Sequence, residues 1–272
     1  MSQTAFVLTK DFYIEKYTLK TPQKIMHYHP SNEIYYIIEG EREYFIESSF
    51  MKAAKGDFVF VPQNLLHRTD GKGATRILIY FSNEFLGHFF SDKIIDTIMS
   101  GFCPRVFRPD EETGKKLSAI IYKILFEYTG NTAKGAEQNY PYLACLLFEL
   151  LFTISTSKNT YIGEVSDNRL NLIVRYINEN FRHITSADEL AEKFFISKYH
   201  LCHIFPEKLG VQLISYINMV KIREACRLID TGKYKITEIA TRCGFNSSSY
   251  FSKVFRREMG MSPQEYRRLK QK

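Results

Sequence analysis

Three histidines and one glutamate near the start of the chain have the types and spacing of metal ligands. His27 and His29 are two positions apart, so on a strand both imidazoles point to the same side, and Glu33 and His67 follow. Three imidazoles and one carboxylate suit Zn, Ni, Fe or Mn. The same four side chains could instead line a ligand pocket or form a polar core.

These side chains need strands to hold them together, and the surrounding sequence is typical of strands. The runs rich in Ile, Tyr, Phe and Val are residues 33–38, 44–47, 58–61 and 76–81. We expect residues 39–41, Glu-Gly-Glu, to form a turn between the first two runs. Many short strands with Gly and Pro between them predict a small barrel or jelly roll over residues 1–82.

This stretch resembles the cupin domain family. The spacing H-x-H-x3-E-x6-G ends at Gly40, the spacing G-x5-P-x4-H ends at His67, and each of the four side chains falls on a cupin metal-ligand position. The chain departs from the pattern at Thr21 and Asn64, which replace glycines, and it lacks the terminal Asn. The resemblance implies a sensor domain that binds a small-molecule effector and could hold a divalent transition metal.

Aromatic residues on the same strands could also recognise an effector. They are Tyr35, Tyr36, Tyr44 and Phe58. Their rings could stack on a sugar or an aromatic ligand, although aromatic side chains in a small barrel also form the core. The resemblance to sensor domains whose effectors include sugars favours a sugar as the effector class.

Residues 83–157 change from the apolar period of strands to that of helices. Two amphipathic stripes run from Leu117 to Tyr128 and from Tyr142 to Ile154. These helices could cover the barrel, form part of its core or provide a homodimer interface, and dimerisation is the role we expect. Residues 158–168 lack periodicity and are expected to be a linker.

The C-terminal part of the chain contains a degenerate internal repeat. The segment 188–191, Asp-Glu-Leu-Ala, recurs 49 positions later as 237–240, Thr-Glu-Ile-Ala. At a spacing of 50, Leu201, Phe205, Gly210 and Tyr216 recur as Phe251, Phe255, Gly260 and Tyr266. Each copy predicts a helix, a tight turn and a second helix that ends at glycine, with a long helix over residues 214–229 between the copies. Two helix-turn-helix units predict an all-helical reader of duplex DNA over residues 169–272.

This domain resembles that of AraC/XylS-type transcriptional regulators. The second copy carries the signature in IATRCGF (239–245), YFSKVFRR (250–257) and GMSPQEYR (260–267), and the first copy matches at equivalent positions. The resemblance implies binding to double-stranded promoter DNA and cooperation with RNA polymerase. Its readout positions fall on Tyr199, Cys202 and His203 in the first reading helix and on Ser248, Ser249, Ser252 and Lys253 in the second, with Arg256 placed for a phosphate.

Two departures concern the first reading helix. Pro206 replaces a residue that is usually basic, and His203 replaces the more usual arginine. Because proline lacks a backbone N–H, we expect Pro206 to kink this helix or end it early. The second unit should then supply more of the charge directed at phosphates.

Charge and cysteine content agree with a DNA-binding protein in a reducing compartment. Residues 158–272 contain 20 Lys and Arg against 12 Asp and Glu, whereas residues 1–157 contain 17 against 18. The five cysteines show no CxxC spacing, and the longest apolar run, residues 143–154, is interrupted by Glu149 and too short to span a bilayer. We expect a cytoplasmic protein with no membrane partner.

The combined expectation is an α+β protein with a cupin-like barrel, central amphipathic helices and two helix-turn-helix units joined by a long helix. We predict a transcription regulator, with activation as the working expectation, that responds to a small molecule and is not an enzyme. A metal-dependent cupin enzyme with a DNA-binding appendage is the alternative, although no additional acid, base or nucleophile stands out. A DNA-repair protein with a reactive N-terminal cysteine cluster fits poorly, because the first cysteine is Cys103.

Overall fold

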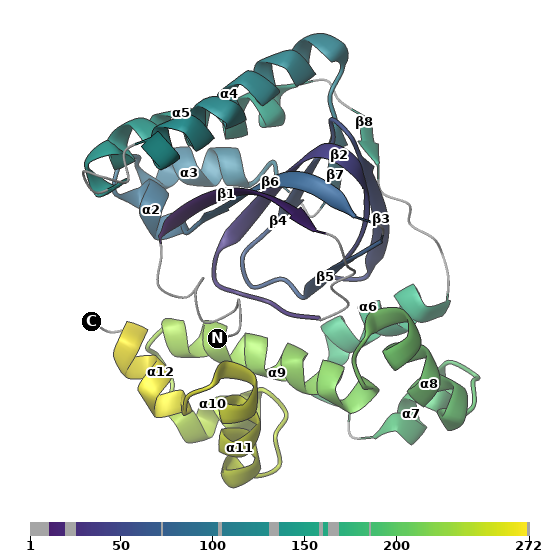
Figure 1. Cartoon of the computed structure of the whole chain (residues 1–272). Helices are drawn as coiled ribbons and strands as arrows, with labels where there is room; N and C mark the ends of the chain where they lie inside the picture. The colour runs from purple at the N-terminus through teal and green to yellow at the C-terminus, as the bar shows by residue number, and fades with distance from the viewer. Residues whose placement is uncertain are drawn as a thin grey trace. The chain divides into compact units, whose positions relative to one another are not determined.

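The chain divides into two compact units, Met1–Val165 and Ser166–Lys272 (Figure 1). The structure is a computed structural model that describes residues 11–19, 26–71, 73–102, 105–130, 136–157, 160–162, 169–184 and 186–270. Thr21, Cys103 and most of the expected linker lie outside these residues. The first unit combines a sheet with helices and the second is helical, so the fold is α+β.

Antiparallel strands build the sheet of the first unit. In chain order they are β1 (Phe12–Leu19), β2 (Asn32–Ile46), β3 (Ser49–Ala54), β4 (Phe58–Val61), β5 (His67–Asp70), β6 (Ala74–Phe81), β7 (Arg105–Arg108) and β8 (Thr160–Ile162). They pair in the order β1-β6-β2-β4-β7-β8, and β3 and β5 also pair with β2. The long strand β2 therefore belongs to two groups of strands.

The turn expected at residues 39–41 is wrong, because β2 continues through it. The first part of β2 pairs with β4 and β6, and the second part pairs with β3 and β5. The register shifts between Ile37 and Glu39, and Gly40 has a φ of +83°. Glycine tolerates this backbone conformation, which lets an irregular strand bend instead of reversing. A Cβ on Gly40 would lie 2.6 Å from the carbonyl oxygen of Gly73.

The sheet extends beyond the barrel boundary expected at residue 82. β7 pairs with the free edge of β4, and β8 pairs with β7 in the part of the chain assigned to the linker. Both strands are short and lie far along the chain from their neighbours. Their assignment depends on edge pairing, which local sequence patterns do not specify.

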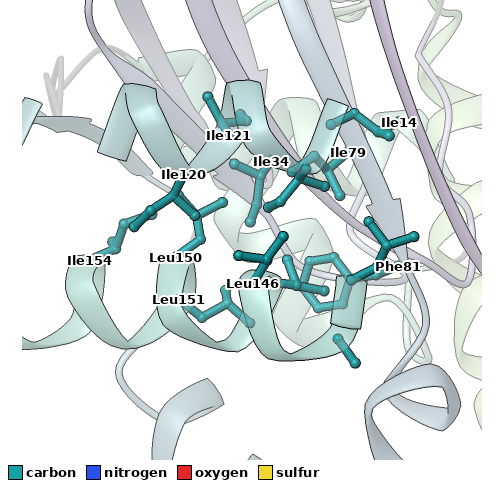
Figure 2. Close-up of a cluster of buried hydrophobic side chains, with 14 of the residues drawn as sticks. Ile14, Ile34, Ile79, Phe81, Ile120, Ile121, Leu146, Leu150, Leu151 and Ile154 are labelled. Atoms are coloured by element: carbon teal, nitrogen blue, oxygen red, sulfur yellow. The ribbon is translucent and has the colours of Figure 1, made fainter. Parts of the chain in front are cut away.

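Helices cover one face of this sheet. They are α2 (Asn83–Gly87), α3 (Asp92–Met99), α4 (Glu111–Gly130), the 3-10 helix η2 (Ala136–Asn139) and α5 (Tyr140–Thr156). Side chains of α4 and α5 meet alternate residues of β1, β2 and β6, as Figure 2 shows for Ile14, Ile34, Ile79 and Phe81. The two predicted apolar stripes therefore form a core with the sheet, which we call the helix-facing cluster.

The opposite side chains of the same strands form a second apolar group, which we call the inner cluster. Its members are Tyr35, Ile37, Tyr44, Ile46, Met51, Ala53, Val59, Val61, Leu78 and Val106. Because successive side chains of a strand point to opposite faces, neighbouring residues such as Ile34 and Tyr35 belong to different clusters.

The second unit consists of helices. They are α6 (Arg169–Asn180), α7 (Ala187–Lys193), α8 (Lys198–Leu209), α9 (Leu213–Asp230), α10 (Ile236–Arg242), α11 (Ser248–Met259) and α12 (Pro263–Lys270). The Ser197 and Ser247 hydroxyls accept from the third backbone N–H of α8 and α11, and both helices end at a left-handed glycine, Gly210 or Gly260. These local signals explain why the sequence predicted both helices.

The internal repeat is also a repeat of packing. The rings of Phe205 and Tyr216 lie 5.7 Å apart, and those of Phe255 and Tyr266 lie 5.8 Å apart, each pair edge to face. All four side chains are buried. The two predicted reading helices, α8 and α11, therefore each pack through a buried phenylalanine against the helix that follows, α9 or α12.

Candidate functional site

The two histidines before β2, the first glutamate of β2 and the first residue of β5 come together inside the first unit. The four side chains are His27, His29, Glu33 and His67, which we call the histidine–glutamate cluster. One ligand atom from each lies within 4.8 Å of all the others. Backbone hydrogen bonds of 3.0 and 2.9 Å between His27 and His67 hold the two segments together.

Hydrogen bonds to the backbone set the tautomers of two of these histidines. Nδ1 of His29 lies 2.9 Å from the carbonyl oxygen of Ser31, and Nδ1 of His67 lies 2.7 Å from that of Leu65. A carbonyl oxygen only accepts, so Nδ1 carries the proton in each ring. Nε2 of each ring therefore faces the cluster, where it offers a lone pair to a metal ion or, with a second proton, donates to Glu33.

The carboxylate of Glu33 lies between these two imidazoles. Its oxygens are 2.8 Å from Nε2 of His29 and 3.1 Å from Nε2 of His67, and Tyr35 donates a hydrogen bond of 2.6 Å to it. Burial acts to raise the pKa of Glu33, but the two histidines outweigh it and hold that pKa well below its usual value. Glu33 is therefore an anion inside the protein.

This donor set fits a cation. Neutral Nε2 atoms and a carboxylate are all electron-pair donors, and placing them in contact without water requires a proton or a metal ion among them. Three imidazoles and a carboxylate are ligands that Zn, Ni, Fe and Mn accept. The cluster could hold such an ion, and protonated histidines would be the alternative.

In the second unit, α8 and α11 expose the residues expected to read DNA. On α8, Tyr199 is 75% exposed and His203 is exposed beside it, with ring centroids 4.1 Å apart, whereas Cys202 is half-buried. On α11, the five predicted side chains are all exposed, as are Tyr250 and Arg257; the predicted ones are Ser248, Ser249, Ser252, Lys253 and Arg256. Most of these side chains, such as His203 and Lys253, point away from the buried phenylalanines of the repeat, whereas Cys202 and Ser248 lie three residues before one.

Comparisons with known proteins match both units. Residues 190–269 match the family described as a helix-turn-helix domain, and residues 15–81 match the family described as a cupin domain. The HTH-type transcriptional activator RhaS of Escherichia coli (strain SE11) is 24% identical over 247 residues, which cover 89% of this chain and 86% of that protein. RhaS of Escherichia fergusonii is 23% identical over 244 residues, with the same coverage.

The chain is an AraC-type regulator with an N-terminal cupin domain. It is a DNA-binding transcription regulator with a ligand-binding cupin domain. The matched helix-turn-helix family and the relatives named as transcriptional activators favour a regulator over an enzyme.

Among solved structures, ToxT from Vibrio cholerae O395 is 16% identical, with a TM-score of 0.37, and the match covers 95% of this chain and 98% of the ToxT chain. The C-terminal domain of AraT from Geobacillus stearothermophilus is 28% identical, with a TM-score of 0.36, over 37% of this chain and 84% of its own. In the described part of the chain, no helix is both long enough and apolar enough to cross a membrane.

Of the two effects expected of Pro206, a kink or an early end of the first reading helix, the early end is wrong. Pro206 does not end the first reading helix early, because α8 continues to Leu209 and Gly210 donates a hydrogen bond of 3.1 Å to the Pro206 carbonyl. Proline removes one backbone donor, and the buried side chains of Phe205 and Leu209 on either side hold the helix in place. Ile204, the residue before Phe205, is only half-buried.

The cupin domain also separates the aromatic residues proposed for effector binding. Tyr35 and Tyr44 belong to the inner cluster, but Tyr36 and Phe58 stack on each other, 4.7 Å apart, on the helix-facing side. Phe58 is fully buried there and Tyr36 is partly buried, so both rings pack against the helix-facing cluster. The pattern also missed Arg76, a buried side chain within an apolar strand, where a charged residue was the available signal.

Proposed function

We propose that the AraC-type regulator binds repeated promoter sites through α8 and α11 and that a small molecule in the cupin domain changes this binding or the activation that follows. The observation that carries the proposal is the pair of capped helices that expose polar residues opposite buried aromatic ones. The 18 residues of α9 between them span about 27 Å, compared with about 34 Å for one turn of DNA.

Within this proposal, the two helices have different roles. Lys253 and Arg256 contact phosphates, and the serines of α11 contact base edges or phosphates. Tyr199, Cys202 and His203 of α8 contact base edges, and this helix directs less positive charge at the phosphates than α11 does. Arg256 lies 3.8 Å from Glu265, and both side chains are exposed, so a phosphate can compete for the arginine.

The regulator is proposed to act as a homodimer through the exposed faces of α4 and α5. Aromatic residues remain exposed on these helices although the opposite faces are fully buried, with Phe126 of α4 71% exposed and Phe152 of α5 51% exposed. A dimer would present four reading helices to a repeated site. The named RhaS relatives are transcriptional activators, which supports activation and contact with RNA polymerase as the output.

The effector is proposed to bind the cupin domain. A sugar is the effector class that the range of effectors of related sensor domains favours. Occupancy has to favour one of two conformations that differ in DNA affinity. A divalent metal in the histidine–glutamate cluster would supply a Lewis-acidic contact for the effector. The same cluster supports a second candidate, a metal-dependent cupin enzyme, which requires metal-dependent turnover of a substrate.

Selection of bound fragments from a random duplex library tests the proposal. We expect enrichment of a repeated motif. The logarithm of the association constant for this motif should fall steeply with the logarithm of the salt concentration. Binding without sequence enrichment, or an affinity that is unchanged between low and moderate salt, would contradict it.

A further inference from the structure

Arg76 of β6 is a buried cation in the inner layer of the cupin domain. Its side chain is 2% exposed, and its Cζ lies 4.4 Å from the ring centroid of Tyr35 and 4.8 Å from that of Tyr17. Nη1 donates to the Tyr44 hydroxyl at 3.3 Å, whereas the buried Nε has no acceptor among the described residues. A phenol oxygen is a weak counterpart for a guanidinium, which favours planar oxyanions.

A second guanidinium increases the excess of positive charge. Arg42 of β2 is buried and donates to Thr69 at 3.0 Å and to the carbonyl of Gly71 at 3.3 Å. Burial, followed by the charge of Arg76, lowers the pKa of Arg42. The charge of Asp70 acts on Arg42 in the opposite direction, whereas no ion pair with a carboxylate offsets the charge of Arg76 in the described part of the chain.

Carboxylates on the neighbouring strands contact other groups. Glu33 belongs to the histidine–glutamate cluster, Glu15 accepts from Tyr13 at 2.9 Å, and Asp70 lies 3.5 Å from Arg68. In the described part of the chain, no carboxylate forms an ion pair with Arg76. The segments 1–10 and 20–25, which flank β1 in sequence, contain no Asp or Glu.

We infer that Arg76 binds an oxyanion of the effector, so that the effector is a small carboxylate or phosphate compound, such as a sugar acid or sugar phosphate, and not a neutral sugar. Arg76 supplies the charged contact, the Tyr35 and Tyr17 rings hold its guanidinium plane, and the Tyr44 hydroxyl can donate a further hydrogen bond. The inference rests on the proposed function, because it specifies the chemistry of the ligand that the cupin domain binds.

Thermal unfolding of the metal-free full chain, without DNA, tests the inference with inorganic phosphate and with acetate. At constant ionic strength, one or both should raise the unfolding midpoint relative to chloride, with an apparent affinity at least tenfold weaker in Arg76→Gln. Lys52→Gln, which removes an exposed cation of β3 in the same unit, should respond like wild type. A response to acetate alone assigns a carboxylate effector, and a response to phosphate alone assigns a phosphate.

No anion effect on wild type, or equal effects on wild type and Arg76→Gln, would overturn the inference. Should Arg76→Gln not fold, Arg76→Lys keeps the charge but loses the planar fork, and it is expected to bind the same anion at least tenfold more weakly. Glucose compared with glucuronate and glucose 6-phosphate then shows whether the charged member of each pair binds better. Because DNA is absent, failure of the DNA-binding proposal does not affect the result.

Discussion

Nε2 of His29 lies 2.8 Å from Oε1 of Glu33, and both side chains are buried. The ring proton of His29 is on Nδ1, where the carbonyl of Ser31 accepts it. The glutamate can be stable there only with a cation, either a second proton on the ring or a metal ion.

We expect untagged protein to contain close to one equivalent of divalent transition metal, measured by elemental mass spectrometry. His67→Ala should lose most of it, because the substitution removes one of four donors that converge on one point. His88→Ala, in an exposed position outside the cluster, is the control. Wild-type protein without metal would instead indicate protonated histidines paired with Glu33.

Loss of positive charge from α11 should weaken DNA binding at every sequence. Lys253→Ala and Arg256→Ala should each reduce the slope of log affinity against log salt by about 1, because one phosphate contact is lost. Fluorescence anisotropy at several salt concentrations measures this slope, with Lys115→Ala on α4 as a control. Tyr199→Ala should change base preference more than it changes the slope. If Lys253→Ala and Arg256→Ala both bind DNA like wild type, the assignment of α11 as a DNA-contacting helix is wrong.

The turns before the two reading helices should respond in opposite ways to substitution. Phe195 has a φ of +51° and is 92% exposed, and its equivalent in the second unit, 49 positions on, is Gly244 with a φ of +74°. Phe195→Gly should therefore raise the free energy of unfolding by about 1 kcal/mol by relieving a left-handed backbone. Gly244→Ala should lower it, because a Cβ would collide with the carbonyl group of Arg182.

Chemical denaturation of the two variants and wild type measures both effects. Destabilisation by Phe195→Gly would show that the exposed ring makes a contact worth more than the strain.

Ion pairs of Glu224 should contribute to stability at neutral pH and not in acid. Hydrogen bonds from Arg227, at 2.8 and 2.9 Å, and then Arg182 lower the pKa of Glu224 despite its partial burial. The stabilisation is present above the unfolded glutamate pKa of about 4.3 and is lost as the pH falls through the lower folded value. Glu224→Gln should cost about 1 kcal/mol at pH 7 and progressively less below pH ~4.

Denaturation of both proteins across this pH range measures the difference. Arg227→Gln should reproduce part of the loss at pH 7, since it removes one partner. A difference between wild type and Glu224→Gln that stays constant with pH would exclude the ion pairs as its cause.

Polar substitutions on α4 and α5 should dissociate the proposed dimer. Phe126→Ser combined with Phe152→Ser should raise the dimer dissociation constant at least tenfold, because both exposed rings would lose a buried contact. Sedimentation equilibrium measures it, with Leu269→Ser on α12, another exposed apolar position, as the control. A wild-type monomer at all concentrations would contradict the proposal.

The helices of the DNA-binding domain could be predicted from the sequence because their signals are local. A serine cap, an apolar stripe and a terminal glycine lie within one helix, and the repeat presents the set twice, at Ser197 to Gly210 and at Ser247 to Gly260. Spacing alone also selected the four residues of the histidine–glutamate cluster, since their order along the chain matches the cupin pattern.

Strand pairing, by contrast, depended on residues far apart in the chain. Nothing near Gly40 distinguishes a bend from a reversal until β3, β4, β5 and β6 are all available as partners of β2. The same holds for β7 and β8, which join the sheet only through its edge. The sequence by itself determined the local helices and the identity of the candidate ligands. Only the tertiary structure decided which face each strand residue occupies, and so placed Tyr35 beside Arg76 and Tyr36 against the helix-facing cluster, because that choice depends on register.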